Sequence, residues 1–392
     1  MHILIALTYY RPHYSGLTIH AEREAIALVN RGHQVTVLTS RFDDGLPARE
    51  VKDGVEIIRP KVAFRISKGV IMPAMPWWAW KLVRSADVIH LHAPQLDAAL
   101  IAMIAKIQKK TVVLTYHCDM HLPRGFVHSL ANVASNLANH LTARLADRIV
   151  HNTYDYAENS PFLKQYLAKV EPILPPVEVT AVSDADRKAF RAKYRLADDD
   201  RLIGMGARLA TEKGVEFLAE ALPTVLERFP RARVLFMGPY QNIVGEEAYA
   251  ARLAPLLVKL GNHWTFLGIL SPVEMTAFFH ECEVTILPSI NGTESYGLVQ
   301  VESMTCGTPV IASDLPGVRV PVQSTGMGMV VPAANPVILA QAIIHVLEIP
   351  QAYRGQPEQF LQASTPAAVA EAYERIFILA SKTIAARKNA AT

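Results

Sequence analysis

The sequence has few cysteines and no long apolar run. Its three cysteines are an odd number, and no two of them form a Cys-x-x-Cys pair. This pattern fits a reducing, cytoplasmic compartment better than a secreted disulfide framework. No stretch of about 18 uninterrupted apolar residues occurs, so no membrane-spanning helix is predicted. Residues 1–7 are apolar but have neither a basic region nor a cleavage site, so we expect a strand there and not a signal peptide.

A strong net charge is also absent. The net charge of +3 is too weak by itself to argue for a nucleic-acid partner, and none is predicted. Residues 1–180 carry +5, whereas residues 181–392 carry −2. This asymmetry favours an anionic partner for the first half, although a mild excess is also common on solvated surfaces. Because 51% of the residues are hydrophobic and 19% are charged, the chain has the composition of a globular protein.

Apolar, β-rich segments alternate with segments of helical periodicity along most of the chain. Alternation of this kind predicts parallel sheets with helices on both faces. In the first half, the predicted strands are residues 2–7, 34–39, 88–91, 111–115 and 149–151. In the second half, they are residues 202–205, 233–237, 264–267, 284–287 and 309–312. The predicted helices include residues 18–30, 130–146, 215–227, 246–260, 272–281 and 366–381.

A proline-rich segment at residues 170–177 separates the two series. Its three closely spaced prolines break any helix and stiffen the chain. The length of 392 residues suits two α/β domains better than one core. We therefore predict two doubly wound parallel-sheet domains, residues 1–175 and 176–365, facing each other across a cleft. Ligands of such sheets bind at the carboxyl ends of the strands.

The segment 291–313 combines a core-like helix pattern with two carboxylates. The predicted helix covers residues 297–306, and Gly307 follows it as the C′ residue. Glycine is a poor helix former, so Gly297 at the first turn indicates that a ligand approaches the backbone closely. The amides of Gly297, Leu298 and Val299 would bind phosphate oxygens, because a helix start offers unpaired N–H groups and a positive dipole end.

Glu302 and Glu294 flank this helix start. Glu302 lies about 7–8 Å along the helix axis from it, roughly the distance from a diphosphate to the ribose hydroxyls of a nucleotide. A carboxylate can accept hydrogen bonds from both vicinal hydroxyls. Glu294 precedes the helix, where a sugar would lie. The alternative is an exposed helix residue and a loop charge, and the glycine between the two carboxylates argues against it.

Two cations follow the first strand of the second half. Arg208 and Lys213 are predicted at the carboxyl edge of the sheet, where they could neutralise a diphosphate leaving group as its charge grows. The nearby Gly204-x-Gly206 lacks the third glycine and the acidic partner of a dinucleotide fingerprint, so it is weak evidence alone. Two surface cations on an ordinary loop are the alternative.

Strand ends in the first half also carry polar side chains. His117 and Asp119 follow one predicted strand, and His92 ends another. A single histidine at a strand end more often has a packing role, but Asp119 lies close to His117, which favours His117 for a site. The loop 9–16, after the first strand, contains a proline and a glycine. The acceptor-side candidates are Tyr10, His13, His92 and Asp119.

The segment from Glu294 to Glu302, with the Ser-Met-Thr-Cys-Gly-Thr-Pro-Val-Ile-Ala-Ser that follows it, resembles the E-x7-E signature of the family 4 retaining glycosyltransferases, which have the GT-B fold. The resemblance covers nearly the whole chain. Further matching segments, in the family's order, are residues 16–39, 87–92, 115–117, 174–178, 208–214, 266–268 and 313–317.

This resemblance implies a role for each candidate. Glu302 would bind the donor ribose and Glu294 the hydroxyls of the donor sugar. Arg208 and Lys213, with the amides of residues 297–299, would hold the diphosphate. Gly16 would belong to the loop on the phosphate side, His117 would lie near the transferred sugar, and a final helix, about residues 366–385, would pack back on the first domain. The chain departs from the family at Ser15, Pro316 and Arg319, where many members have glycine, glycine and glutamate.

The resemblance also implies a reaction. A hexose-type sugar would move with retention from a nucleotide-diphosphate sugar, such as a UDP-sugar, to a glycan or lipid-linked acceptor in cell-envelope polysaccharide or glycolipid synthesis. The departing phosphate would take the acceptor's proton, because Asp119 is not expected to act as a nucleophile. The alternatives are a nucleotide-sugar epimerase or hydrolase of the same fold, and a non-catalytic binding protein, which the intact set of four charged residues argues against.

No metal or other cofactor is expected. Asp184-Ala-Asp186 has the letters of a metal-binding DxD motif, but it lies just before a predicted helix and away from the strand ends. Arg208 and Lys213 offer the diphosphate positive charge without a metal ion.

A tryptophan-rich segment, residues 73–84, contains Trp77, Trp78 and Trp80. On helical spacing, Trp77, Trp80, Lys81 and Arg84 share one face. We expect this face to contact an anionic membrane peripherally, on the inner side of the cytoplasmic membrane. The alternative is that the tryptophans fill the core. The cations expected around them are Arg59, Lys61, Arg65, Lys68, Lys81 and Arg84.

Overall fold

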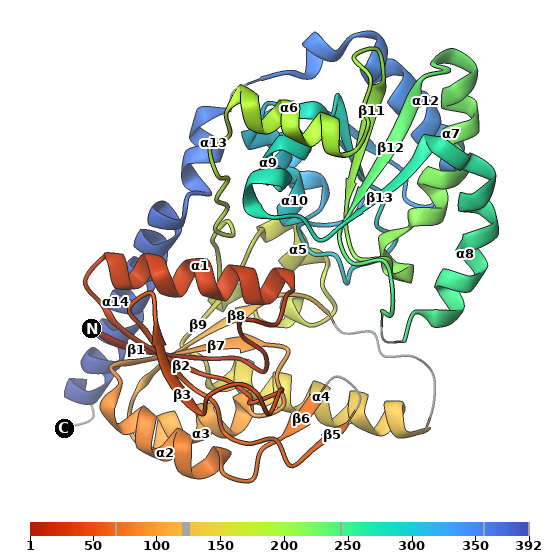
Figure 1. Ribbon diagram of the computed structural model, residues 1–392. Helices are drawn as coiled ribbons and strands as arrows, with labels where there is room; N and C mark the ends of the chain where they lie inside the picture. The colour runs from red at the N-terminus through yellow and green to blue at the C-terminus, as the bar shows by residue number, and fades with distance from the viewer. Residues whose placement is uncertain (67–68, 120–125, 244, 356, 391–392) are drawn as a thin grey trace. The chain divides into compact units, whose positions relative to one another are not determined.

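The computed structural model describes residues 1–66, 69–119, 126–243, 245–355 and 357–390 (Figure 1). The chain divides into two compact units. Unit 1 comprises Met1–Pro176 and Ala363–Thr392, and unit 2 comprises Val177–Gln362. The division after Pro176 lies within the proline-rich segment 170–177, one residue beyond the domain boundary predicted after residue 175. Within the described ranges, no helix is long and apolar enough to cross a membrane.

Unit 1 contains an eight-stranded sheet in the order β10-β9-β8-β7-β1-β2-β4-β3. Among the described strands of this sheet, only β3 runs antiparallel to its neighbour. The strands are β1 (His2–Ala6), β2 (Gln34–Leu38), β3 (Arg49–Lys52), β4 (Val55–Ile58), β7 (Val88–Ala93), β8 (Thr111–Tyr116), β9 (Arg148–His151) and β10 (Val170–Pro172), and a separate hairpin consists of β5 (Phe64–Ile66) and β6 (Gly69–Ile71).

The central strands were predictable because they are buried on both faces. Every residue of β7 and β8 is buried, and such strands read as nearly continuous apolar runs. The predictions of strands at residues 2–7, 34–39 and 111–115 are confirmed to within one residue. Strand β3 escaped prediction because it is short, charged and exposed at the sheet edge, as edge strands often are.

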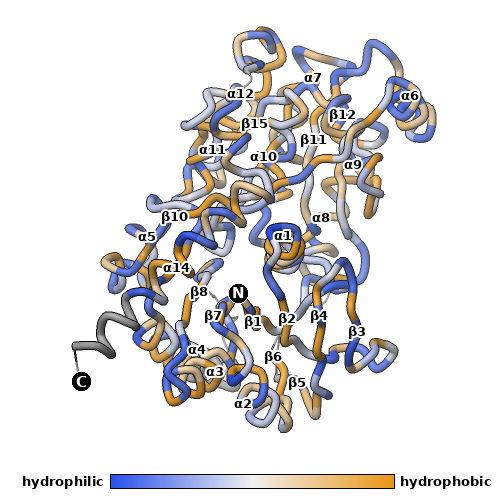
Figure 2. The backbone as a smooth tube through the Cα atoms, turned by 90° about the vertical axis from the view of Figure 1, so that its left-hand side faces the viewer, coloured by the Kyte–Doolittle hydropathy of each residue, from blue (hydrophilic) through white to orange (hydrophobic). Residues whose placement is uncertain are grey.

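Two groups of helices cover the sheet of unit 1. One core cluster contains residues of α2 and α3, and another contains residues of α1 and α14, so each pair covers one face (Figure 1). Seen nearly along its axis in Figure 2, α1 is hydrophilic on one side and hydrophobic on the other. The helices are α1 (Gly16–Asn30), α2 (Met75–Ser85), α3 (Ala98–Ile107), α4 (Phe126–Leu145), α5 (Tyr154–Asn159) and α14 (Pro366–Ala390).

The last helix, α14, returns from the end of unit 2 to unit 1. Its residues Val369, Tyr373 and Phe377 are buried at a spacing of four, which forms one apolar stripe. The stripe packs on α1 and β8. The Tyr373 hydroxyl lies 2.9 Å from Thr115 Oγ1 on β8, and Arg31 after α1 forms an ion pair with Glu374. The chain thus closes unit 1 with its final helix.

Unit 2 contains a parallel six-stranded sheet in the order β13-β12-β11-β14-β15-β16. This is the 3-2-1-4-5-6 order of the Rossmann fold, and it reverses direction between β11 and β14. Ligands of such sheets bind beyond the carboxyl ends of the strands at that reversal. The strands are β11 (Arg201–Gly206), β12 (Ala232–Met237), β13 (Trp264–Gly268), β14 (Val284–Leu287), β15 (Val310–Ser313) and β16 (Gly328–Val331).

The helices of unit 2 pack on both faces of its sheet. Residues of α7, α8 and α12 belong to one core cluster, and residues of α6 and α9 belong to another. Ser183 caps α6 by accepting a hydrogen bond from the Asp186 amide, so Asp184-Ala-Asp186 forms a helix start. The helices are α6 (Asp184–Lys193), α7 (Val215–Arg228), α8 (Glu247–Leu260), α9 (Pro272–Glu281), α10 (Leu298–Thr305), α11 (Arg319–Thr325), α12 (Pro336–Glu348) and α13 (Glu358–Ala363).

The packing of α14 on α1 and β8 can be tested by removing the buried phenyl ring of Phe377. Phe377→Ala removes a side chain with no exposed surface, and we expect unit 1 to lose about 3–5 kcal/mol of unfolding free energy. Leu379→Ala, on the same helix but 57% exposed, should change it by less than about 0.5 kcal/mol. Urea unfolding curves measure both values, and equal losses would contradict the packing described.

Candidate active site

The loops after β11 and β14 approach each other closely at the switch point of unit 2. Gly214 closes the first loop in a left-handed conformation, with φ of 62°. A Cβ atom on this residue would lie 2.2 Å from the Pro288 carbonyl oxygen, which begins the second loop. Because the obstacle is backbone, only glycine permits this approach. The two loops that carry the predicted charged residues are therefore held together by direct contact.

An ion pair joins the two loops. Lys213 Nζ lies 2.5 Å from Glu294 Oε2, and both side chains are largely buried. Ser289 Oγ lies 3.5 Å from the same carboxylate oxygen. Two residues predicted for the site from separate segments are thus brought together, 81 positions apart in the chain. The pair fixes the position of the carboxylate and of the ammonium group.

Arg208 lies in the first of these loops and pairs with Glu212. Burial acts to raise the pKa of Glu212, but Arg208, the residue's own backbone N–H and Lys213 outweigh it, so the pKa lies below its ordinary value. The Glu212 carbonyl also accepts a hydrogen bond from the Ile290 amide, at 3.1 Å, across to the other loop. The sequence analysis missed Glu212, although its spacing of four from Arg208 was the available signal.

The helix predicted over residues 297–306 is confirmed as α10, with Gly297 as its N-cap. Gly297 has φ of 80°, and Gln300 Nε2 donates hydrogen bonds to the carbonyls of Tyr296 (2.6 Å) and Val318 (3.0 Å). The amides of Leu298 and Val299 belong to the first turn, where no intrahelical acceptor exists. This helix start can therefore donate hydrogen bonds to an anion.

Glu302 is buried in the second turn of α10, with 7% of its surface exposed. The alternative that it is an ordinary exposed helix residue is wrong. Burial, and the neighbouring Glu302 carboxylate, raise the pKa of Cys306 to about 12, so this thiol stays protonated. The structure therefore places a buried carboxylate in the second turn of α10.

Gly16, Tyr10 and His13 lie around the first loop of unit 1. Gly16 is exposed at the first position of α1, where Ser15 and Thr18 form a capping box. Tyr10 is 3% exposed and packs in the core, so the structure gives it no surface for an acceptor. His13 is half-buried and stacks on Tyr9 with ring centroids 4.7 Å apart. Burial lowers the pKa of His13 below its ordinary value.

His92 and His117 lie together at the ends of β7 and β8. His92 Nδ1 is 2.9 Å from His117 Nε2. Burial lowers the pKa of both side chains well below the ordinary value, and nearby histidines act in the same direction with a smaller effect. Both side chains are therefore neutral at neutral pH. Asp119 Oδ1 accepts hydrogen bonds from the hydroxyls of Tyr116 (3.0 Å) and Ser160 (2.9 Å). The carboxylate is therefore positioned by two hydroxyl groups of its own unit.

Three polar residues behind His92 escaped the sequence analysis. Glu24, His20 and His90 are all buried in the interior of unit 1. Glu24 lies on the buried face of α1. His90 lies two positions before His92 on a strand whose other residues are apolar. Buried polar residues at core positions were the signal that could have found them.

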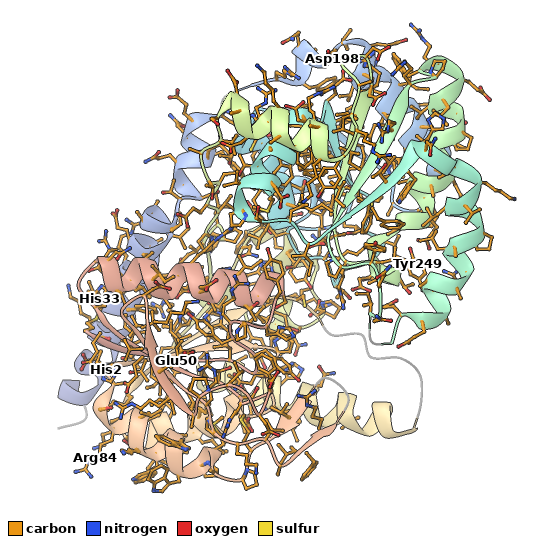
Figure 3. The ribbon with its side chains drawn as sticks, viewed as in Figure 1. His2, His33, Glu50, Arg84, Asp198 and Tyr249 are labelled. Carbon is orange, nitrogen blue, oxygen red and sulfur yellow. The ribbon has the colours of Figure 1, made fainter. Side chains whose placement is uncertain are left out.

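Helix α2 presents part of the tryptophan-rich segment to solvent. Trp77 and Trp80 are 59% and 50% exposed, whereas Trp78 packs partly against the core. Lys81 Nζ lies 5.2 Å from the centre of the Trp77 ring, and the Arg84 side chain extends away from unit 1 (Figure 3). The expectation that the tryptophans fill the core is therefore met in part by Trp78 alone, and Trp77 and Trp80 are left exposed.

One expected surface cation was assigned wrongly. Arg59 is 2% exposed and forms an ion pair with Glu50 at 2.6 Å, and it donates a hydrogen bond to the Arg11 carbonyl at 3.0 Å. The Glu50 carboxylate and the Arg11 carbonyl stabilise the charge of the Arg59 guanidinium inside unit 1. Lys61 and Arg65 are exposed, and Lys68 lies outside the described residues.

Two Rossmann-like parallel-sheet units in one chain define the GT-B fold of glycosyltransferases. Residues 186–362 match the family described as "Glycosyl transferases group 1", and residues 15–164 match a "Glycosyl transferase 4-like domain". The chain therefore combines a glycosyltransferase 4-like domain with a glycosyltransferase group 1 domain that follows it.

Similar proteins agree with this assignment. An uncharacterized glycosyltransferase of Methanocaldococcus jannaschii is 25% identical over 353 residues, which is 85% of each chain. Phosphatidyl-myo-inositol mannosyltransferase of Mycobacterium leprae is 28% identical over 85% of this chain and 83% of that protein. The crystal structure of Anabaena HepE with UDP-glucose has a TM-score of 0.70 at 21% identity and covers 100% of both chains. It supports the fold.

The close approach of the two loops can be tested at Gly214. Ala in a left-handed conformation costs about 1–2 kcal/mol, and Gly214→Ala additionally displaces the Pro288 backbone. Gly326→Ala is the matched control, because Gly326 has φ of 68° and its Cβ would meet nothing within 4 Å. We expect a larger loss of unfolding free energy in Gly214→Ala, by chemical denaturation. Equal losses would show that the loops can separate freely.

Proposed function

We propose that this chain is a retaining glycosyltransferase that moves a hexose-type sugar from a nucleotide-diphosphate sugar to a glycan or lipid-linked acceptor. The observation that carries the proposal is the grouping of Lys213, Glu294 and the buried Glu302 around the glycine start of α10. Structural neighbours of the same fold include HepE, which was solved with UDP and UDP-glucose. A UDP-sugar is accordingly the first donor to try.

The diphosphate would lie at the start of α10. The first-turn amides donate hydrogen bonds there, and Lys213 and Arg208 come from the loop held against it. Both cations already have carboxylate partners, which fix their positions before the donor binds. Positioned charges of this kind stabilise the leaving diphosphate as its negative charge grows in the transition state.

The two glutamates would recognise the groups on either side of the diphosphate. Glu302, about one and a half turns into α10, would accept hydrogen bonds from the ribose hydroxyls. Glu294 would accept hydrogen bonds from hydroxyls of the donor sugar, while its ion pair with Lys213 fixes the position of the carboxylate. Two hydroxyl donors from one ligand would offset the desolvation cost of a carboxylate, because hydrogen bonds to a charged group are stronger than those to a neutral one.

The chemistry would be a front-face transfer with retention. Asp119 Oδ1 is occupied by two hydroxyl groups, which does not favour it as a nucleophile. The acceptor hydroxyl would attack the anomeric carbon on the side from which the phosphate leaves, and the phosphate oxygen would take the acceptor proton. Neutral His117 would hydrogen-bond the transferred sugar without adding charge. Orientation and charge stabilisation would supply the rate enhancement.

The acceptor proposal rests on the exposed surface of α2. Trp77, Trp80, Lys81 and Arg84 combine aromatic rings and cations, the composition of surfaces that bind anionic lipid interfaces. The neighbouring α3 adds the exposed side chain of Ile107. The name of the mycobacterial relative, a phosphatidyl-myo-inositol mannosyltransferase, denotes a lipid acceptor. We therefore favour a lipid-linked acceptor at the membrane surface.

The donor site can be tested at Glu302. Glu302→Ala removes an acceptor of charge-assisted hydrogen bonds, which are worth about 1.5–3 kcal/mol, so donor affinity should fall roughly 10-fold to 150-fold. Thr305→Ala, exposed on the same helix, should leave affinity unchanged. Isothermal titration with UDP-glucose and GDP-mannose measures both variants. Unchanged affinity in folded Glu302→Ala would remove this residue from the site.

Product analysis separates the proposed transfer from its alternatives. Mass spectrometry of turnover with a panel of nucleotide sugars and lipid acceptors should show a glycosylated acceptor. A free or epimerised sugar without any dependence on acceptor would indicate the hydrolase or epimerase alternative. Binding without turnover under every condition would indicate a binding protein.

The diphosphate is expected to need no Mg²⁺ or Mn²⁺, because Arg208, Lys213 and the start of α10 meet its charge. Turnover should therefore persist in EDTA at the rate measured before chelation. If EDTA abolished turnover and Mg²⁺ or Mn²⁺ restored it, the charge assignment at the diphosphate would be wrong.

The membrane contact can be tested by liposome flotation at low salt. Wild-type protein should float with anionic vesicles, and the double variant Trp77→Ala/Trp80→Ala should float much less. Val51→Ala, a similarly exposed residue of β3, is the control and should behave as wild type. If the wild-type protein ignored anionic vesicles, a soluble acceptor would be favoured.

A further inference from the structure

A group of polar side chains occupies the interior of unit 1. Glu24 extends from α1, and His90 and His92 extend from β7. All three are fully buried. His90 and His92 are two positions apart on one strand, so their side chains lie on the same face of the sheet. A carboxylate at such a position is costly unless something pairs with it.

The facing atoms of these residues are not satisfied by hydrogen bonds. Glu24 Oε1 lies 2.9 Å from His90 Nδ1, and Glu24 Oε2 lies 3.7 Å from His92 Nε2. None of these four atoms has an aligned hydrogen-bond partner in the described part of the chain. Four buried polar atoms therefore converge on one another.

The opposite nitrogens of the two imidazoles are occupied. His90 Nε2 lies 2.8 Å from Thr115 Oγ1, and His92 Nδ1 lies 2.9 Å from His117 Nε2. Each ring is thus oriented by one nitrogen and presents the other to Glu24. This is the arrangement of metal-ligating histidines, in which the second nitrogen is held by an outer partner.

The spacing of the converging atoms suits a single metal ion. Two ligands about 2.0–2.1 Å from an ion in tetrahedral geometry are about 3.3 Å apart. The observed 2.9 and 3.7 Å lie on either side of this value, and the ligand atoms of the three residues all lie within 4.8 Å of one another. Two imidazoles and one carboxylate favour Zn²⁺ over Mg²⁺ or Ca²⁺, which take oxygen ligands.

We propose that Glu24, His90 and His92 bind one Zn²⁺ ion in the interior of unit 1. His20 stands beside them, with Nε2 3.5 Å from Glu24 Oε2 and 2% of its side chain exposed, and it can supply a further imidazole. The ion would tie α1 to β7. The residues that hold the ligating rings, Thr115 and His117, extend its effect to β8.

This site is distinct from the donor residues of unit 2 and does not depend on the proposed function. Its role would be structural, because its ligands are buried and its outer partners continue into the core. Thr115 Oγ1 lies 2.9 Å from the Tyr373 hydroxyl, and that hydroxyl lies 3.4 Å from His20 Nε2, so α14 closes over the group. The ion would thereby stabilise the position of His92 and, through it, of His117.

Metal analysis of the full-length protein tests the site. Protein purified from zinc-supplemented cells should contain one equivalent of zinc by inductively coupled plasma mass spectrometry. The zinc-free protein should bind Co²⁺ with visible d–d absorption and without a thiolate charge-transfer band, because no cysteine belongs to the proposed ligand set. Adding Zn²⁺ should displace Co²⁺ and raise the melting temperature.

Variants locate the ion. Glu24→Gln and His92→Asn should each lose the cobalt bands, and His263→Asn, a unit 2 residue, should keep them. If a variant fails to fold, the wild-type cobalt titration and the zinc-dependent melting temperature decide alone. Absence of zinc together with no cobalt spectrum and no thermal shift would overturn the proposal and leave an ion-pair network. Cobalt spectra retained in folded Glu24→Gln and His92→Asn would also overturn it.

Discussion

The contact between the loops after β11 and β14 is the constraint on which the donor side of this protein depends. Gly214 lies against the Pro288 carbonyl, so the backbones meet without an intervening side chain. The contact brings Lys213 and Glu294 within 2.5 Å, on loops that are far apart in sequence. It also places both beside the start of α10. The proposed diphosphate site depends on this contact, since it would bring backbone amides and fixed cations together at the point where the strand order reverses.

On the face of the unit 1 sheet that α1 and α14 cover, the core includes a group of buried polar side chains. Glu24 and the histidines of β7 lie between the sheet and α1, and Tyr373 of α14 reaches the same group through Thr115. A helix from the end of the chain thus completes the environment of residues near its beginning. Buried polar networks favour one arrangement strongly, because each unsatisfied member is costly. His117 takes its position from this network, through His92.

On the outer surface of unit 1, neighbouring residues of one helix differ in whether they are buried or exposed. Within α2, Trp78 contributes to the core while Trp77 and Trp80 face solvent. Helical spacing correctly placed Trp77, Trp80, Lys81 and Arg84 on one face. It could not place Arg59, which forms an ion pair with Glu50 inside unit 1, because that pairing joins two segments of the chain through the fold.

The sequence by itself determined the alternation of strands and helices, the link near Pro176, and α10 with its glycine start. These features have local causes, namely hydrophobic periodicity, proline and glycine, and they can be read within short windows. The tertiary structure decided which charges meet. The pairing of Lys213 with Glu294, the burial of Glu302 and the convergence of Glu24 on His90 and His92 depend on strand order and packing, which bring together residues that no local pattern relates.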